Sequence, residues 1–518
     1  MPQKPPNILW VMADDHAANA VSAYRSRLAE VFPTPNIDRL GLEGARFDAA
    51  FCTNAICTPS RAVILTGQHG HRTGVRTLSD GLDPSVTTFP QLLHDAGYET
   101  ALFGKWHLHR EPRGFDHYEV LPCHGTYWNP RFLATGFDWS RYTLEGAEQL
   151  GIPEEGHVTD LITAKSLAWL AGRRPERPWL LLCHHKAPHD DFEYQPRFAH
   201  LLDEVTIPAP ESLWEDRSHR SEGSRFYGSS VSERNPTRNA VHRMSQWDYP
   251  TGRLDVRDLD AAGRARAAYA KYLSDYLRTA EGLDDSVGRL LDHLDQTGLS
   301  GDTVVVYTSD QGMFLGEHDY IDKRWIFDES LRLPLFVRHP PTVAPGTVVE
   351  EVVSNLDFAP TLLDLAGVPI PPSMQGRSLR PLLSGAGGPW DDEIYYRYWM
   401  HLTDHDVPAH LGIRSRRYKL ICFYGLPLDA TDAVPEPTPA GWELYDLECD
   451  PYETRNVFGE PEYREVAGQL RNRLTALRSR YGDEDERFPE VAARMRHAWE
   501  AGWGTPAGTV RADGGIGA

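Results

Sequence analysis

The segment Ile8-Leu-Trp-Val-Met-Ala13-Asp14-Asp15-His16 decides the fold, because a short apolar run ends there in a group of polar residues. The same arrangement recurs three times, with polar groups after the apolar runs 100–103, 179–183 and 303–308. Runs that are apolar on both faces are typical of strands buried between helices, and open α/β sheets bind ligands beyond the carboxyl ends of their strands. We therefore expect the four polar groups to meet at one site.

Helical patterns separate these apolar runs. The clearest pattern covers residues 261–297, where apolar residues recur near the helical period before Gly298. This alternation of strands and helices predicts an α/β fold with a doubly wound, mostly parallel sheet. The segment 203–260 is rich in Pro, Ser, Arg and Asp, and we interpret it as a long surface excursion near the site.

The sequence changes in character after about residue 385. Residues 384–389 are typical of a linker, and the alternating runs 393–399 and 418–424 predict antiparallel strands. We expect a catalytic domain over residues 1–385 and a smaller C-terminal α+β domain with an antiparallel sheet over 386–503. The Gly/Ala-rich segment 504–518 is typical of a flexible tail.

Composition and charge exclude several classes of protein. The chain has 518 residues, with 53 Lys and Arg against 74 Asp and Glu, and its net charge of −21 argues against nucleic acid as the main partner. No apolar run approaches the roughly 18 residues of a membrane helix, and the first residues do not resemble a signal peptide. We therefore expect a cytoplasmic protein with no membrane partner. The six cysteines show neither zinc spacing nor a disulfide pattern.

Two acidic groups indicate a metal site. Asp14-Asp15 and Asp310-Gln311 each place adjacent oxygen ligands at the end of a predicted buried strand. Three carboxylates and an amide oxygen in one place repel one another unless a cation neutralises them, and an all-oxygen set favours Ca²⁺ or Mg²⁺ over zinc. Either pair taken alone is also compatible with a loop or a helix cap.

A third feature is the segment Cys57-Thr-Pro-Ser-Arg61, which precedes the helical run 62–66 and Gly67. Pro59 suits the first turn of a helix and places Cys57 at the helix N-terminus, where amide donors and the helix dipole favour an anion. Arg61 adds a fixed positive charge. The alternative for Cys57 is a small buried residue without chemistry.

This pentapeptide resembles the Cys-x-Pro-Ser-Arg signature of the type I sulfatases, in which a dedicated maturation enzyme converts the cysteine to formylglycine. The resemblance spans about residues 7 to 457 and continues through the segments 65–67, 97–98, 104–107, 186–189, 309–312, 315–318, 322–324 and 443–451. It implies an alkaline-phosphatase-like α/β/α sandwich and the hydrolysis of a sulfate ester.

The resemblance also implies a metal, usually Ca²⁺ in this family, with Mg²⁺ or Mn²⁺ as alternatives. Its ligands are Asp14, Asp15, Asp310, Gln311 and the formylglycine made from Cys57. Gln311 stands where the family more often has Asn or His, and its amide oxygen is a suitable ligand.

The remaining catalytic roles are likewise implied by the resemblance. Arg61 fixes the formylglycine, and His107 acts on the aldehyde hydrate. Lys105, His189 and Lys323 bind sulfate oxygens or protonate the leaving oxygen. A hydrated aldehyde has two hydroxyls on one carbon, so one can attack sulfur while loss of a proton from the other ejects sulfate.

The resemblance implies that the substrate is a sulfated small molecule or saccharide. The segments 114–116, 125–131, 186–189 and 205–208 together resemble bacterial sulfatases that act on N-acetylglucosamine 6-sulfate and related glycosaminoglycan sugars. We expect substrate contacts from His318, and from His405 and His410 in a polar, aromatic stretch between two predicted strands. The alternatives are a general arylsulfatase, a phosphonate or phosphate ester hydrolase of the same superfamily, and a non-catalytic binding protein in which Cys57 stays a thiol.

Overall fold

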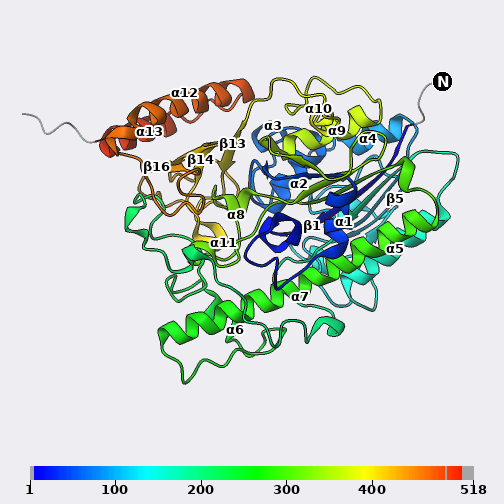
Figure 1. Cartoon of the computed structure of the whole chain (residues 1–518), viewed down its shortest axis with the longest axis horizontal. Helices are drawn as coiled ribbons and strands as arrows, with labels where there is room; N and C mark the ends of the chain where they lie inside the picture. Colours follow the sequence, from blue (N-terminus) through cyan, green and yellow to red (C-terminus); the bar gives the residue numbers. More distant parts are fainter. Residues whose placement is uncertain (1–4, 485–486, 504–518) are drawn as a thin grey trace, which may run out of the picture.

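The computed structural model describes residues 5–484 and 487–503. Its central sheet contains β1 (Asn7–Ala13), β2 (Ala45–Phe47), β4 (Glu99–Lys105), β5 (His117–Leu121), β6 (Arg131–Ala134), β7 (Ile152–Pro153), β8 (Trp179–His184), β9 (Thr303–Ser309), β10 (Leu335–Arg338) and β11 (Thr347–Val349) (Figure 1). The order is β11-β2-β10-β9-β1-β8-β4-β5-β6-β7. Strands β9, β1, β8, β4 and β5 are parallel, and β10 and β6 run antiparallel beside them. The predicted mostly parallel sheet is confirmed.

Strand β1 shows why helices cover both faces of this sheet. Residues 8, 10 and 12 belong to one hydrophobic core and residues 9, 11 and 13 to another, and all six are buried. The first core includes residues of α2 (Cys57–Thr66), α4 (Phe89–Asp95) and α9 (Phe358–Leu365), and the second includes residues of α1 (Pro35–Glu43), α5 (Val158–Gly172) and α7 (Ala261–Gln296). A strand with two apolar faces needs a helical layer on each side, and the expected α/β/α sandwich is confirmed.

A second sheet follows in the chain. It consists of β13 (Glu393–Tyr398), β14 (His410–Ser415), β15 (Tyr418–Phe423) and β16 (Gly441–Asp446), paired antiparallel in that order. One face packs against α12 (Arg464–Tyr481) and α13 (Pro489–Gly502), which lie at one end of the molecule in Figure 1. The other face contributes Tyr396, Tyr398 and Phe423 to the first core of the large sheet. The predicted antiparallel sheet is confirmed, whereas the boundary at residue 385 stays a prediction and residues 504–518 lie outside the described chain.

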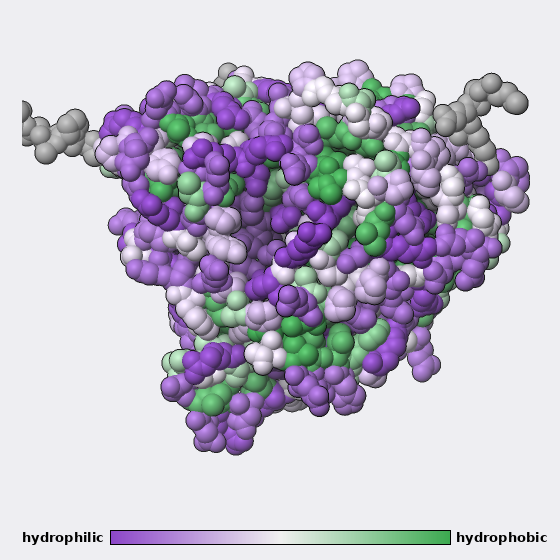
Figure 2. All heavy atoms as spheres, in the orientation of Figure 1, coloured by the Kyte–Doolittle hydropathy of each residue, from purple (hydrophilic) through white to green (hydrophobic). Residues whose placement is uncertain are grey.

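The remaining elements are short. They are β3 (Ala50–Phe51), β12 (Val353–Ser354), α3 (Gly70–Thr73), α6 (Ala240–Met244), α8 (Asp328–Leu331), α10 (Arg380–Leu383) and α11 (Thr403–Asp406), together with several 3₁₀ turns. Hydrophilic residues dominate the face shown in Figure 2, where apolar residues form separate patches. Within residues 5–484 and 487–503, none of the helices is both long and apolar enough to cross a membrane.

Gly104 in β4 provides a test of how tightly β4 and β8 approach. Its φ is +102°, and a Cβ atom there would lie 1.9 Å from the carbonyl oxygen of His184 in β8. We expect Gly104→Ala to destabilise the fold by about 3 kcal/mol or more, because the backbone must move and the new side chain is strained. Thermal denaturation at a fixed scan rate measures the change. Gly298→Ala is the matched control, since its φ is +70° but no heavy atom lies within 4 Å of the added Cβ. Equal midpoints for the two variants would contradict this explanation.

Candidate active site

The carboxyl ends of four parallel strands bring the predicted residues together. In the register of the sheet, Ala13 of β1 lies beside Ser309 of β9, and His184 of β8 lies beside Gly104 of β4. The polar groups that follow these strands therefore start at the same edge of the sheet. Cys57 joins them from the first turn of α2, and Lys323 comes from the loop after β9.

Three carboxylates form the centre of this site. One oxygen from each of Asp14, Asp15 and Asp310 lies within 4.8 Å of the others, and all three residues are fully buried. Burial, together with the charge of Asp14, raises the pKa of Asp310 to about 7. Within the described residues, Asp14 Oδ1 and Gln311 Oε1 accept no hydrogen bond. Buried oxygens without donors are suited to a hard cation, so this group can hold a divalent metal.

Cys57 lies beside the carboxylates at the start of α2. It is buried, its sulfur is 4.0 Å from Gln311 Nε2, and ligand atoms of Cys57, Asp14 and His189 lie within 4.8 Å of one another. The helix ends at Gly67, as predicted, where a left-handed residue closes the last turn. The structure thus places a potential nucleophile next to the potential metal ligands.

Arg61 lies one turn after Cys57 and braces the site from inside the protein. Its Nε donates to Asp310 Oδ2 at 2.9 Å, and its Nη1 donates to the carbonyl oxygen of Lys105 at 2.7 Å. The side chain is fully buried, so its charge is available to the carboxylates with little screening.

Two lysines neutralise the other carboxylates. Lys105 Nζ forms a buried ion pair with Asp14 Oδ2, and Lys323 Nζ contacts Asp15 Oδ2 at 2.5 Å. The burial of Lys323 opposes its charged form, but carboxylates, above all Asp15, hold its pKa well above the ordinary value. Both ammonium groups are therefore charged at neutral pH.

His189 is protonated in this setting. Its Nε2 is 3.7 Å from Asp15 Oδ2, and its Nδ1 is 2.7 Å from Asp190 Oδ1. Burial and Lys323 act to lower the pKa of His189, but the surrounding carboxylates outweigh them and raise it to about 10. The imidazolium is a proton donor at neutral pH.

His107 is the neutral counterpart. It is buried, and burial, assisted by the nearby charge of Lys105, lowers its pKa well below the ordinary value. Its Nδ1 has no hydrogen-bond partner within the described chain. A neutral imidazole with a free nitrogen can accept a proton.

The sequence analysis missed His124, which the structure places among these groups. His124 Nδ1 lies 3.3 Å from Lys105 Nζ, and its ring is 4.2 Å from that of His107 and 5.1 Å from that of His189. The only available signal was its position after the short run 119–121, which forms the end of β5.

Of the three histidines expected to contact substrate, His405 is the one that pairs with Asp322, the neighbour of Lys323. Its Nε2 is 3.5 Å from Asp322 Oδ1, next to Lys323, and a quarter of its side chain is exposed. His318 is fully buried and pairs with Glu215 at 2.7 Å. His410 begins β14 and packs among aromatic rings that include Trp325 and Phe423. Because neither His318 nor His410 contacts the groups around Cys57, we do not carry them forward as substrate contacts.

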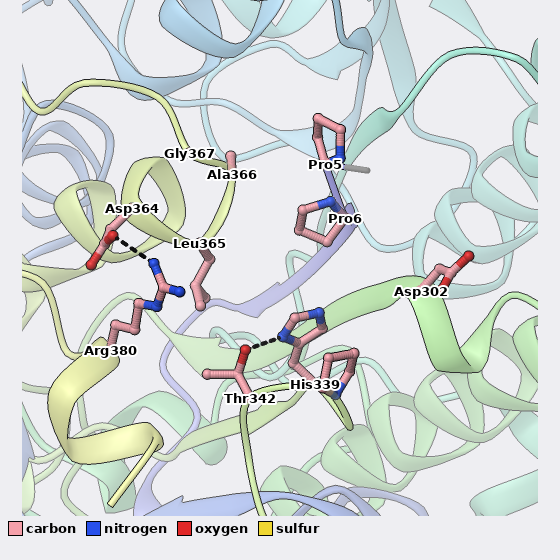
Figure 3. Close-up of a pocket in the computed structure, with 11 residues that line it drawn as sticks. Pro5, Pro6, Asp302, His339, Thr342, Asp364, Leu365, Ala366, Gly367 and Arg380 are labelled. Atoms are coloured by element: carbon pink, nitrogen blue, oxygen red, sulfur yellow. Dashed lines mark hydrogen bonds and ion pairs between the residues drawn. The ribbon is translucent and has the colours of Figure 1, made fainter. Parts of the chain in front are cut away.

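The cavity drawn in Figure 3 is remote from this site. It has a volume of about 410 Å³ and is lined by Pro5 and Pro6 before β1, Asp302 before β9, and Asp364 and Arg380, which form an ion pair at 3.1 Å. The candidate site follows the opposite ends of β1 and β9, about 23 Å away along a seven-residue strand. This cavity therefore takes no part in the site.

Comparison with known proteins agrees with the geometry. Residues 6–368 match the family described as Sulfatase, and residues 316–480 match that described as N-sulphoglucosamine sulphohydrolase, C-terminal. The N-acetylglucosamine-6-O-sulfatase of Bacteroides thetaiotaomicron is 35% identical over 517 residues, which cover 93% of this chain and 88% of the relative. The chain therefore belongs to the sulfatase family.

Two solved structures extend this result. A protein in complex with its substrate, D-glucosamine-2-N,6-O-disulfate, has a TM-score of 0.83 at 33% identity, covering 94% of this chain and 100% of that one. The phosphonate monoester hydrolase of Agrobacterium radiobacter has a TM-score of 0.68 at 21% identity, covering 92% and 96%. The second likeness shows the shared fold alone.

Asp14 gives a direct test of metal binding, because its Oδ1 is one of the two oxygens without a donor. We expect Asp14→Asn to weaken the binding of Ca²⁺ to metal-stripped protein by about tenfold or more, since a charged ligand is lost with little change in shape. Isothermal titration calorimetry measures the affinity. Asp292→Asn, at an exposed position on α7, is the control and should leave the affinity unchanged. Identical affinities for wild type and Asp14→Asn would exclude Asp14 as a ligand.

Proposed function

We propose that this sulfatase hydrolyses the 6-O-sulfate ester of a glucosamine-type sugar. The observation that carries the proposal is the position of Cys57 beside a buried carboxylate cluster that is itself paired with the ammonium groups of Lys105 and Lys323. The relatives support the choice of sugar, because one is an N-acetylglucosamine-6-O-sulfatase and another binds a glucosamine disulfate as its substrate.

The proposed metal is Ca²⁺, with Mg²⁺ or Mn²⁺ as alternatives. Asp14, Asp15, Asp310 and Gln311 would hold it together with residue 57. Asp14 Oδ1 and Gln311 Oε1, which accept no hydrogen bond within the described chain, support this assignment. When bound, the cation supplies positive charge to the sulfate oxygens and favours ionisation of a hydroxyl on residue 57.

Residue 57 is proposed to act as formylglycine, made from Cys57 by a maturation enzyme. The hydrated aldehyde supplies two hydroxyls on one carbon, which a thiol or a serine lacks. Cys57 begins a helix whose residues 57–66 are all buried, and Arg61 is fixed by Asp310 and the carbonyl oxygen of Lys105. The position of residue 57 is thus held by the protein rather than by the substrate.

The side chains around residue 57 have separate proposed roles in sulfate binding and proton transfer. Lys105 and Lys323 hold the sulfate oxygens and stabilise the charge that develops on them. His189, protonated at neutral pH, donates its Nε2 proton to the leaving sugar oxygen. His107, the neutral imidazole, takes a proton from residue 57 and so allows sulfate to leave. Asp190 accepts from His189 Nδ1 and keeps that ring in orientation.

A phosphonate or phosphate ester hydrolase is the second candidate. Sulfate, phosphate and phosphonate groups are all tetrahedral oxyanions, and two lysines and a cation can bind each of them. The phosphonate hydrolase shares the fold at 21% identity, which gives its activity no weight for this chain. The sulfatase family match over residues 6–368 favours the sulfate ester. A general arylsulfatase differs only in the recognition of the leaving group.

His405 is the proposed contact to the sugar. Its Nδ1 lies 3.1 Å from Ser229 Oγ and its Nε2 faces Asp322, so the ring is held from two sides while part of it stays exposed. This places an imidazole beside the loop that carries Lys323, at the rim of the sulfate-binding groups.

Conversion of Cys57 is directly measurable. We expect the peptide containing residue 57, from protein produced in its own host, to react with an aldehyde probe, and we expect Cys57→Ser to lower steady-state turnover about a thousandfold, because it can transfer sulfate once but cannot release it. Mass spectrometry and turnover on a small aryl sulfate measure the two effects. Cys449→Ser, at an exposed cysteine, should retain full turnover. A fully active enzyme with only a thiol at residue 57 would overturn the mechanism.

A substitution at His405 tests sugar recognition separately from sulfate chemistry. We expect His405→Ala to lower kcat/KM on glucosamine 6-sulfate about tenfold and to leave kcat/KM on a small aryl sulfate unchanged, because the sulfate-binding groups come from other elements. His94→Ala, at the end of α4, is the control on both substrates. An equal loss on both substrates would remove His405 from sugar recognition and favour the arylsulfatase reading.

A further inference from the structure

The cations around residue 57 are almost all paired with carboxylates. Arg61, Lys105, Lys323 and Arg324 each contact a carboxylate oxygen, and the partners are Asp310, Asp14, Asp15 and Asp322 respectively. Their charges are therefore already balanced in large part by the protein. The carboxylates hold these cations in place, and an incoming anion must share each cation with the carboxylate that is already paired with it.

Lys186 is different. It lies in the loop after β8 and is only 5% exposed, yet within residues 5–484 and 487–503 no carboxylate oxygen lies within the 4.0 Å of an ion pair. The contact of its ammonium is with the ring of Tyr127, whose centroid is 5.0 Å away. An ammonium with so little exposure and no ion pair is poorly solvated, so an incoming anion is a favourable partner for it.

The backbone fixes Lys186 at the site. Asp14 N donates to the carbonyl oxygen of Ala187 at 3.1 Å, and His189 N donates to that of Lys186 at 3.1 Å. The hydroxyl of Tyr127 donates to the carbonyl oxygen of His189 at 2.5 Å. The segment 186–189 is thus attached both to the acidic cluster and to the ring beneath the Lys186 ammonium.

Charged groups of the site act on Lys186. Burial, reinforced by the charge of Lys105, lowers the pKa of Lys186 below its ordinary value. The carboxylates of Asp14, Asp190 and Glu193 oppose this shift without outweighing it. His124 feels the charges of both Lys105 and Lys186. His124 accepts from Lys105 at Nδ1, which leaves Nε2 to carry the single N–H proton of a neutral ring. His124 is thus a neutral N–H donor beside Lys105, and it belongs to the group of side chains whose charges interact with Lys186.

We propose that Lys186, with His124 beside it, binds an anionic sulfate oxygen of the substrate as a sulfate-binding residue additional to Lys105 and Lys323. The inference rests on the proposed function, and it deepens it by adding a group that recognises the substrate. The sulfate is either the reacting one or a second sulfate on the same sugar, since both present the same oxygens.

Kinetics with three substrates distinguish binding of the reacting sulfate from binding of a second sulfate. The variants are Lys186→Met, which keeps an unbranched side chain as far as Cε but lacks the ammonium, and Lys186→Arg, which keeps the charge. They are measured as matured, metal-loaded enzyme on a small aryl sulfate, on glucosamine 6-sulfate and on glucosamine 2-N,6-O-disulfate. We expect Lys186→Met to raise KM about tenfold and Lys186→Arg to restore most of the loss, because a charge-assisted hydrogen bond is removed and then replaced.

Thermal stability distinguishes a substrate-binding role of Lys186 from a merely structural one. If Lys186 only stabilised the fold, its removal would lower the denaturation midpoint. We expect Lys186→Met to denature at the same or a higher temperature than wild type, because a charge that burial disfavours is removed, and to be stabilised less by inorganic sulfate. Lys165→Met is the matched control. Lys165 is paired with Glu119 and Glu154, so its removal should lower the midpoint and leave the kinetics unchanged.

The outcomes are distinct. A loss on all three substrates assigns Lys186 to the reacting sulfate, and a loss confined to the disulfate assigns it to the second sulfate; both support the proposal. Two results overturn the proposal. One is an unchanged KM of Lys186→Met on all three substrates. The other is a lowered denaturation midpoint of Lys186→Met together with undiminished stabilisation by inorganic sulfate. If the wild type cleaves the aryl sulfate but neither sugar, the proposed sugar substrate fails while the aryl sulfate and inorganic sulfate still test Lys186.

Discussion

Repulsion among three buried carboxylates is the constraint on which this structure depends. Asp14, Asp15 and Asp310 approach within 4.8 Å in an environment that screens charge poorly. Their neutralising partners come from different parts of the fold, since Arg61 lies on α2, Lys105 ends β4 and Lys323 follows β9. The carboxylates can be buried only when these elements are all in place, so the charge balance of the site and the packing of the sheet depend on one another.

The second sheet is tied to the same charges. The hydroxyl of Tyr396 in β13 donates to the carbonyl oxygen of Arg324, and it accepts from Ala55 N at 3.3 Å. One phenol from the antiparallel sheet therefore connects the loop that carries Lys323 to the segment just before Cys57. Farther along, Lys419 of β15 is buried between Asp328 and Glu453, at 2.7 Å from each. These contacts position the two sheets through polar groups as well as through the shared core.

Much of this arrangement could be predicted from the sequence. Strands β1, β4, β8 and β9 are apolar on both faces, and parallel strands end at a common edge, so the polar groups after them had to meet. His124 escaped notice because β5 is partly exposed and no group of polar residues marks its end. His410 was expected in a connecting loop, but the short sequence 410–415 alternates too weakly to reveal the strand that it begins. Which carboxylate neutralises which cation depends on contacts between distant elements and cannot be derived from spacing.

The core shared by the two sheets has a consequence for engineering the chain. Tyr396, Tyr398 and Phe423 are as much part of the large sheet's interior as of the small one's, so the C-terminal part cannot be exchanged for another as an independent module. His405 in α11 keeps a quarter of its side chain exposed and belongs to none of the hydrophobic cores of the described residues. Substitutions at His405 therefore leave the common interior in place, whereas substitutions at the three aromatic residues disturb both sheets.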